Sequence, residues 1–289
     1  MSKPTSTRVT SKNILITGCS SGIGFCAAKL LKLRGYNVIA SVRKEQDAFA
    51  LQQLGITTVV LDLADSQSIQ QAIAFSLIQF DGRIDVLFNN AAYGQPGAVE
   101  DLSRDVLRQQ FETNVFGTQE LTNLVIAQMR KQGHGRIIYN SSVLGIISMA
   151  YRGAYNASKY AIEGLADTLR QELYDTNIHI SLIEPGPILS QFRANAFHKY
   201  QQNIDKTSSA HHQTYSLMEQ RLTKQGPAAP FTLPPEAVVD KLIHAIENKR
   251  PKIRYYVTFP TYLFATLKRL LPHRWLDWVL IKISEGEHK

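Results

Sequence analysis

Short apolar runs rich in β-branched residues alternate along the chain with longer segments of helical periodicity. The runs are NILITG, NVIAS, TTVVLDL, IDVLFNN, GRIIYNSS and IHISLIEPG. The segments between them that carry apolar positions at helical spacing are residues 24–34, 66–79, 103–130 and 154–175. This alternation predicts a parallel sheet with helices on both faces. Because crossovers are right-handed, we expect a doubly wound α/β fold of the Rossmann type, with ligands at the carboxyl ends of its strands.

The alternation stops after residue 192. Residues 193–228 are polar and carry no strand signal, so we interpret about 189–230 as an insertion that covers the site as a lid. A further helix over 235–248 and a short strand over 253–257 follow, and an apolar and basic tail occupies about 258–289. We expect residues 1–289 to form a single domain.

A glycine-rich turn, TGCSSGIG at residues 17–24, directly follows the first predicted strand and opens a helix. Its three glycines permit a tight turn and the close approach of a pyrophosphate to the helix N-terminus, where free N–H groups and the helix dipole favour an anion. The spacing G-x-x-x-G-x-G differs from the G-x-G-x-x-G fingerprint, and alone it could be an ordinary turn. Its position after the first strand favours dinucleotide binding.

The end of the second predicted strand indicates which dinucleotide is bound. NAD-binding folds usually carry an acidic residue there for the ribose 2′-hydroxyl, whereas an arginine accommodates a 2′-phosphate. Here the strand ends VIASVRK, with Arg43 and Lys44 and no acid before Glu45. An exposed basic pair is the alternative interpretation. We predict NADP(H) rather than NAD(H).

The third predicted strand ends at Asp62, in VVLDLAD. This places the carboxylate where it can meet the adenine amino group. The alternative role is to cap the following helix, although Asp65 and Ser66 are better placed for that.

A tyrosine and a lysine stand four residues apart in GAYNASK, within a predicted helix. At this spacing Tyr155 and Lys159 share one helix face. A nearby cation favours the phenolate, so we expect Lys159 to lower the pKa of Tyr155 towards the range useful for acid–base catalysis. Ser142 ends a predicted core strand thirteen residues earlier and could hydrogen-bond a substrate oxygen. Such tyrosine–lysine pairs also occur by chance, so the pair is informative only together with the serine and the glycine-rich turn.

Taken together, these motifs resemble the short-chain dehydrogenases/reductases of the Tyr-x-x-x-Lys type. TGCSSGIG, NNAAYG, FETNVFG, IIYNSS, YNASK and EPGPI occur in that family's order and cover about residues 12–192. The resemblance implies the sheet order 3-2-1-4-5-6-7. The whole chain is similar to a bacterial branch related to 17β-hydroxysteroid and retinol dehydrogenases, in which some members are assigned as NADP-dependent aldehyde reductases.

The resemblance also implies a role for each site residue. Tyr155 would be the general acid in reduction and the general base in oxidation, and Lys159 would bind the nicotinamide ribose. Ser142, rather than the neighbouring Ser141, would polarise the carbonyl. Asn114 would hold a water that links Lys159 to solvent; the alternative is a buried amide on a helix that holds two strands together, and the residue could do both. The implied cofactor contacts are Gly18, Ser20, Ser21, Gly22, Ile23, Gly24, Arg43, Asp62, Leu63, Asn90, Ala91, Tyr155, Lys159, Pro185 and Ile188. One departure is NNAA, with Ala92 where the family more often has glycine.

Composition and charge exclude several other classes of protein. The formal charge is +8, from 32 basic and 24 acidic residues, but the basic residues are spread out, which argues against a nucleic-acid binder. One of the two cysteines lies inside the first motif and the other two residues after it, and this usage predicts a reducing, cytoplasmic setting without disulfides. The eight histidines lack ligand spacing, so we expect no metal site. The polar N-terminus shows no signal peptide.

Apolar residues cluster near the predicted site, which suits a hydrophobic aldehyde, ketone or alcohol. They are Tyr93, Val143, Leu144, Ile146, Ile188, Leu189 and Phe192, and each could equally belong to the core. The tail carries YYVTFPTYLFATL, which is too short to span a membrane. It could contact a membrane surface peripherally, wall the site or form a subunit contact. The resemblance implies a homodimer or homotetramer.

Two other functions remain open from the sequence. The chain could reduce 3-oxoacyl groups on an acidic carrier protein, which basic residues such as Arg130 and Lys131 would dock. It could also be a catalytically silent protein that senses the cofactor. The complete set of Asn114, Ser142, Tyr155 and Lys159 argues against the silent protein, because a retired site has no need of it.

Overall fold

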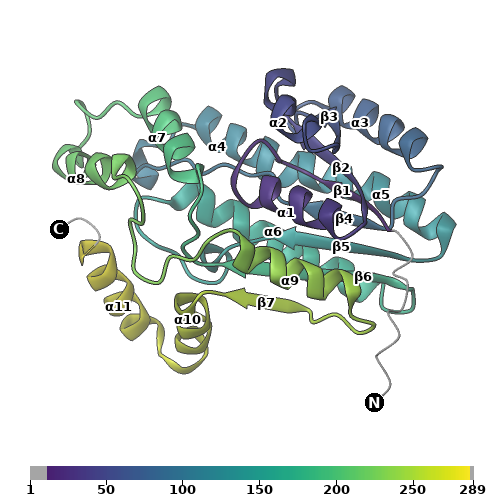
Figure 1. Ribbon diagram of the computed structural model, residues 1–289. Coiled ribbons are helices and arrows are strands. Elements are labelled where there is room, and N and C mark those ends of the chain that lie inside the picture. Colours follow the sequence, from purple (N-terminus) through teal and green to yellow (C-terminus); the bar gives the residue numbers. More distant parts are fainter. Residues whose placement is uncertain (1–11, 287–289) are drawn as a thin grey trace, which may run out of the picture.

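A seven-stranded parallel sheet forms the centre of the computed structural model, which describes residues 12–286 (Figure 1). The strand order is β3-β2-β1-β4-β5-β6-β7, as the resemblance implies, and every neighbouring pair is parallel. The strands are β1 (Asn13–Ile16), β2 (Asn37–Val42), β3 (Thr57–Val60), β4 (Val86–Asn89), β5 (Gly135–Asn140), β6 (Ile178–Pro185) and β7 (Arg254–Val257). The doubly wound α/β fold expected from the hydrophobic pattern is confirmed.

Helices cover both faces of the sheet, and alternate strand residues point into two separate cores. Ile14 and Ile16 pack on the face covered by α1 (Gly22–Leu33) and α9 (Glu236–Glu247), whereas Leu15 packs on the opposite face. That second face is covered by α3 (Ser66–Gln79), α5 (Thr118–Gln132) and α6 (Gly153–Glu172). Burial on both sides explains why the strands are almost continuously apolar.

The predicted helix over 103–130 is interrupted in the structure. It consists of α4 (Arg104–Phe111), a π-helical turn (Glu112–Gly117) and α5. A single π-helical turn is too short to alter the apolar pattern of the whole segment, so periodicity alone does not reveal this interruption. It brings Gly117 so close to the loop after β3 that a Cβ there would lie 1.7 Å from the carbonyl oxygen of Leu63. Turns of this kind are frequent at functional sites.

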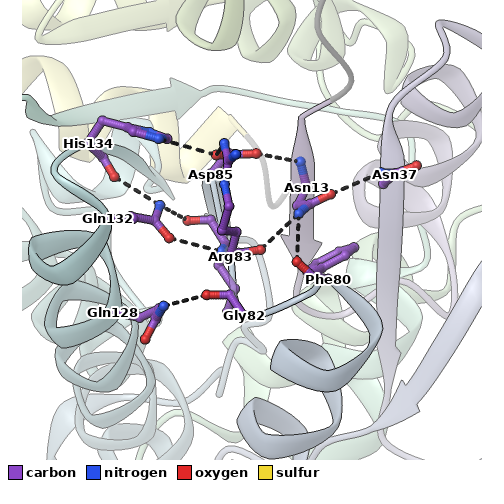
Figure 2. A network of polar contacts seen from close by, with 10 residues as sticks. Asn13, Asn37, Phe80, Gly82, Arg83, Asp85, Gln128, Gln132 and His134 are labelled. Carbon is purple, nitrogen blue, oxygen red and sulfur yellow. Dashed lines mark hydrogen bonds and ion pairs between the residues drawn. The ribbon is translucent and has the colours of Figure 1, made fainter.

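A polar network ties the amino ends of the central strands together (Figure 2). Asn13 donates from its backbone N–H to Asp85 Oδ2 at 2.9 Å and from its amide to the carbonyl oxygens of Phe80 and Arg83. Gln132 at the end of α5 pairs with both backbone groups of Ile84. In this fold ligands bind at the carboxyl ends of the strands, so this network stabilises the end away from the site.

Beyond the carboxyl ends of the strands lie two helical pairs (Figure 1). The predicted insertion contains α7 (Phe192–Asn203) and α8 (His212–Thr223), which bury Tyr200 and Tyr215 in a small core of their own. The tail forms α10 (Phe259–Leu270) and α11 (His273–Gly286), which pack on the loop after β5 through Phe264, Leu276 and other apolar residues. Shorter helical turns lie at Glu45–Ala48, Phe49–Gln52, Val99–Asp101 and Val143–Gly145. Within residues 12–286, every helix is too short or too polar to cross a membrane.

Candidate active site

The glycine-rich turn between β1 and α1 has the backbone that its sequence predicts. Gly18 and Gly22 adopt positive φ angles of 71° and 57°, which side-chain-bearing residues rarely adopt. Gly24 lies so close to the turn that a Cβ there would stand 2.2 Å from the Gly18 carbonyl oxygen. Ser21 precedes α1 without capping it, so the first N–H groups of the helix remain available to an anion. Ser20 and Ile23 flank these groups in the same turn, and the cradle fits a dinucleotide pyrophosphate.

Side chains at the carboxyl ends of three neighbouring strands, β1, β4 and β5, hold this turn in place. Thr17 Oγ1 accepts from the backbone N–H groups of Asn90 and Ala91, both at 2.9 Å. The Asn90 amide donates to the carbonyl oxygens of Thr17 and Gly18, and its own oxygen accepts from Asn140 at 2.9 Å. The Asn90 side chain therefore stabilises the turn, while its predicted contact with the cofactor stays a prediction. The roles of Thr17 and Asn140 were not predicted from the sequence, although both lie within its motifs.

The residues expected to choose the nucleotide lie at the carboxyl ends of β2 and β3. Arg43 is exposed directly after β2, and the charge of its guanidinium reaches the Tyr93 phenol. Asp62 follows β3 and accepts from the backbone N–H of Ala64 at 3.0 Å. As expected, Asp65 caps α3 by accepting from Gln67 N at 2.9 Å. Asp62 is therefore not the N-cap of this helix. The side chain of Leu63 is buried in the core.

Tyr155 and Ser142 meet where α6 passes the carboxyl end of β5. Burial raises the pKa of Tyr155 above its usual value, and a hydrogen bond with the Ser142 hydroxyl acts in the opposite direction. The Tyr155 ring meets Phe192 of α7 edge-on, with 5.2 Å between the ring centroids. The predicted lowering of the Tyr155 pKa by Lys159 is not seen in the structure: burial raises this pKa, and the opposing influence comes from Ser142 and not from the lysine. Tyr155 is therefore a neutral hydroxyl that holds its proton at neutral pH.

Lys159 is buried beneath the tyrosine ring, one turn further along α6. Its Nζ lies 5.6 Å from the Tyr155 ring centroid and donates to the Asn140 carbonyl oxygen at 2.7 Å. Burial lowers the pKa of Lys159 to about 8, and the nearby charge of Glu163 raises it in part. The lysine thus titrates near physiological pH, while a backbone carbonyl fixes its direction.

Asn114 lies in the π-helical turn and joins two parts of the site. Its amide donates to the Tyr93 carbonyl oxygen at 3.0 Å and to Ser158 Oγ at 3.1 Å. Its oxygen accepts from the backbone N–H of Tyr93 at 3.2 Å. Asn114 therefore acts as a buried amide that links the loop after β4 to α6, beside Lys159. A water at this residue stays a prediction.

The apolar residues predicted near the site do not form a single group. Val143 and Ile146 pack with α10 and α11 in an apolar cluster, and Ile188 packs against the core beneath α1. Phe192 instead covers Tyr155, and Leu189 is half-exposed. Pro185 ends β6, and Ile188 pairs with Leu233 in a short bridge, so the segment between them runs over the carboxyl edge of the sheet.

Comparisons with known proteins agree with this geometry. A family model described as short chain dehydrogenase matches residues 12–201. An uncharacterized oxidoreductase of Escherichia coli, YbbO, is 42% identical over 273 residues, covering 94% of this chain and 95% of that protein. The chain belongs to the short-chain dehydrogenase family. Its similarity to an NADPH-dependent 3-dehydrocapnine reductase of Ornithobacterium rhinotracheale is 31% identity, over 93% of this chain and 95% of that one. A short-chain dehydrogenase from Streptomyces avermitilis matches in structure with a TM-score of 0.75 and 26% identity, over 96% of each chain.

As a short-chain dehydrogenase, the protein is an oxidoreductase that acts on CH–OH and carbonyl groups. The predicted set of Ser142, Tyr155 and Lys159 converges at one place, and Asn114 adjoins it through Ser158. The roles of two acids behind Lys159, Glu163 and Glu184, were not predicted from the sequence. The available signal for Glu184 was an acidic residue inside an otherwise apolar strand run.

Proposed function

We propose that the protein is an NADPH-dependent reductase of hydrophobic aldehydes or ketones, and catalyses the reverse oxidation of the corresponding alcohols. The observation that carries this proposal is the meeting of Tyr155 with Ser142 above Lys159, at the same sheet edge as the glycine-rich turn. The test is a panel of aldehydes, ketones and alcohols followed by nicotinamide absorbance. Turnover of lipophilic members is expected; no turnover of any carbonyl or alcohol would contradict the proposal.

The side chains divide the proton chemistry between them. Ser142 donates a hydrogen bond to the substrate carbonyl and fixes its position, and the Tyr155 hydroxyl protonates the same oxygen as negative charge develops on it. The raised pKa of Tyr155 keeps the proton in place until that charge appears. The Lys159 ammonium then stabilises the phenolate that remains. A bound nicotinamide dinucleotide would supply the hydride, with its pyrophosphate held at the N-terminus of α1 and its ribose by Lys159.

We propose a preference for NADPH because Arg43 follows β2 at the place where NAD-binding folds carry an acidic residue. Among the described residues no hydrogen bond or ion pair engages Arg43, so its planar guanidinium is available to a 2′-phosphate. One relative is described as an NADPH-dependent reductase, which supports the same choice.

Replacing Arg43 by Asp is expected to reverse this preference. Loss of a charge-assisted pair and gain of repulsion should lower kcat/KM for NADPH about 100-fold, with little loss for NADH. The measurement is the ratio of kcat/KM for the two cofactors with one aldehyde. Lys131→Asp makes the same charge change at the far end of α5 and serves as the matched control. An unchanged ratio in Arg43→Asp would contradict the assignment.

We also propose that the cytoplasmic protein touches membranes peripherally through α11. Trp275, Trp278 and Ile281 are 67%, 64% and 55% exposed and recur every three residues, so they share one face. Exposed Arg274 directly precedes Trp275 on α11, and exposed Arg269 lies in the last turn of α10. Interfacial helices that bind anionic bilayers combine such apolar and cationic groups. A hydrophobic substrate dissolved in the bilayer would then be close to the loop after β5, on which these helices pack.

Flotation with liposomes that contain anionic lipid tests this contact. The double replacement of Trp275 and Trp278 by Ser is expected to reduce the bound fraction at least tenfold, because each buried indole contributes about 1.5–3 kcal/mol. Tyr174→Ser removes an exposed aromatic from another surface and is the control. If the parent protein stays at the bottom of the gradient, while size exclusion shows that the double variant disrupts a homodimer or homotetramer, the face is a subunit contact instead.

A further inference from the structure

A buried group of charged side chains lies directly behind Lys159 and takes no part in the steps above. Glu163 stands one turn beyond the lysine on α6 and is 7% exposed; Glu184 lies near the end of β6 and is 0% exposed. Arg254, the first residue of β7, joins them, because its Nη1 donates to both Glu163 Oε2 and Glu184 Oε1. Residues from three elements thus converge on one guanidinium nitrogen.

The negative charge in this group exceeds what Arg254 compensates. Its second nitrogen donates to Asp167 at 2.7 Å, and Asp167 also pairs with Arg170 at 2.6 Å near the surface. Glu184 Oε2 is buried without a hydrogen-bond partner within the described residues, whereas the Ser141 hydroxyl lies against Glu163 and acts to lower its pKa. Two carboxylates this close in a dry environment repel each other, so they share a proton near neutral pH.

The shared proton is coupled to the active site through Glu163. The side chain of Glu163 packs beneath the loop after Ser142, since a Cβ on Gly145 would lie 3.0 Å from Glu163 Cγ. The charge of Glu163 opposes the lowering of the Lys159 pKa by burial. Burial and repulsion from Glu163 raise the pKa of Glu184 to about 8, and burial also raises the pKa of Glu163. The charge that Lys159 experiences therefore depends on which of the two acids is ionised.

We propose that Glu163 and Glu184, bridged by Arg254, are positioning residues that maintain the positive charge of Lys159. The proton is divided between the two acids, and only in the molecules in which Glu184 carries it is Glu163 ionised and able to stabilise the ammonium. The other groups around the pair are Asp167 and Arg170 on the same helix and Tyr256 on β7, on which Arg269 of α10 also acts. Asp167 is the other acid that touches Arg254 and is more exposed, so its influence is smaller.

Two single replacements are expected to shift the pH dependence of reduction in opposite directions. The basic limb of kcat/KM follows loss of the Lys159 proton. Glu163→Gln removes the charge that raises the Lys159 pKa, so the limb moves to lower pH by about one unit. Glu184→Gln removes the repulsion that disfavours ionised Glu163, so the limb moves to higher pH. A merely structural role would lower the rate of both variants without moving the limb in opposite senses.

Infrared spectroscopy gives a readout that does not require turnover. The protein at about pH 7 is expected to show the stretch of a protonated buried carboxyl group, and either replacement should remove it, because the remaining acid ionises against Arg254. Glu172→Gln removes an exposed acid from the same helix and should leave the band and the pH profile unchanged. Circular dichroism checks that each variant is folded.

The outcomes separate this inference from the proposed function on which its kinetic test rests. The role of the pair would be overturned if the basic limbs of Glu163→Gln and Glu184→Gln shifted in the same direction or did not shift. Absence of the protonated carboxyl band would overturn it as well. If no carbonyl compound is turned over, the proposed function fails, and the band together with the pH dependence of NADPH binding still decides the inference. Should Glu163→Gln not fold, Glu184→Gln and Asp167→Asn must both move the limb upward, the second less.

Discussion

Replacing Tyr155 by Phe is expected to lower the kcat of carbonyl reduction by about 10³-fold. A positioned general acid contributes about 10²–10⁴-fold to such reactions, and the phenylalanine removes the proton donor alone. The ring itself is retained, together with its edge-on contact with Phe192 at 5.2 Å. The fold and the cofactor cradle should therefore be unchanged, and NADPH binding, followed by nicotinamide fluorescence, should stay within about threefold of the parent.

Tyr160→Phe is the matched control for this experiment. Tyr160 lies on the same helix and donates its hydroxyl to the Ile146 carbonyl oxygen at 2.6 Å, outside the group of reacting side chains. Its loss should reduce the free energy of unfolding by about 1 kcal/mol and leave kcat nearly unchanged. If Tyr155→Phe retained a tenth or more of the parent rate, another group would be the proton donor. A protein that binds cofactor without any turnover, before or after the replacement, would instead be the silent sensor considered from the sequence.

The fold could be predicted from the sequence because its strands are buried on both faces. Runs such as NILITG remain apolar throughout, and the segments between them keep one apolar stripe, so the two periods are easily separated. The helix expected over 66–79 has those bounds in the structure, since Asp65 supplies a clear N-terminal cap. The interruption at Glu112–Gly117 could not be predicted in this way, because a π-helical turn leaves the composition of the helix unchanged.

The positions of Ser142, Tyr155 and Lys159 were predictable, but their electrostatics were not. The four-residue spacing indicates that Tyr155 and Lys159 are neighbours, and it says nothing about how deeply each is buried. Desolvation depends on residues far away in the chain, and here it raises the pKa of the tyrosine and lowers that of the lysine to about 8. The link between Glu163 and Arg254 joins residues 91 positions apart. Neither local spacing nor composition contains such information.

Replacing Gly24 by Ala is expected to weaken dinucleotide binding at least 100-fold. The new Cβ would lie 2.2 Å from the Gly18 carbonyl oxygen and 2.7 Å from the Asn90 amide nitrogen, distances at which the backbone must move. That movement disrupts the hydrogen bond of 3.1 Å from Asn90 to Gly18 and displaces the N–H groups that would hold the pyrophosphate. The Kd for NADPH, from fluorescence titration, measures the loss.

Gly164→Ala provides the matched control, because Gly164 lies within α6 and a Cβ there would meet nothing within 4 Å. This change should leave the Kd unaltered and raise the free energy of unfolding by about 0.5–1 kcal/mol, as alanine favours helix. Both replacements add one methyl group to a helix that packs on the sheet. The difference between their Kd values therefore measures the effect of the close backbone approach at the glycine-rich turn. Equal Kd values for Gly24→Ala and the parent would mean that the cofactor does not bind at the N-terminus of α1, and Tyr155 would then lack a hydride donor beside it.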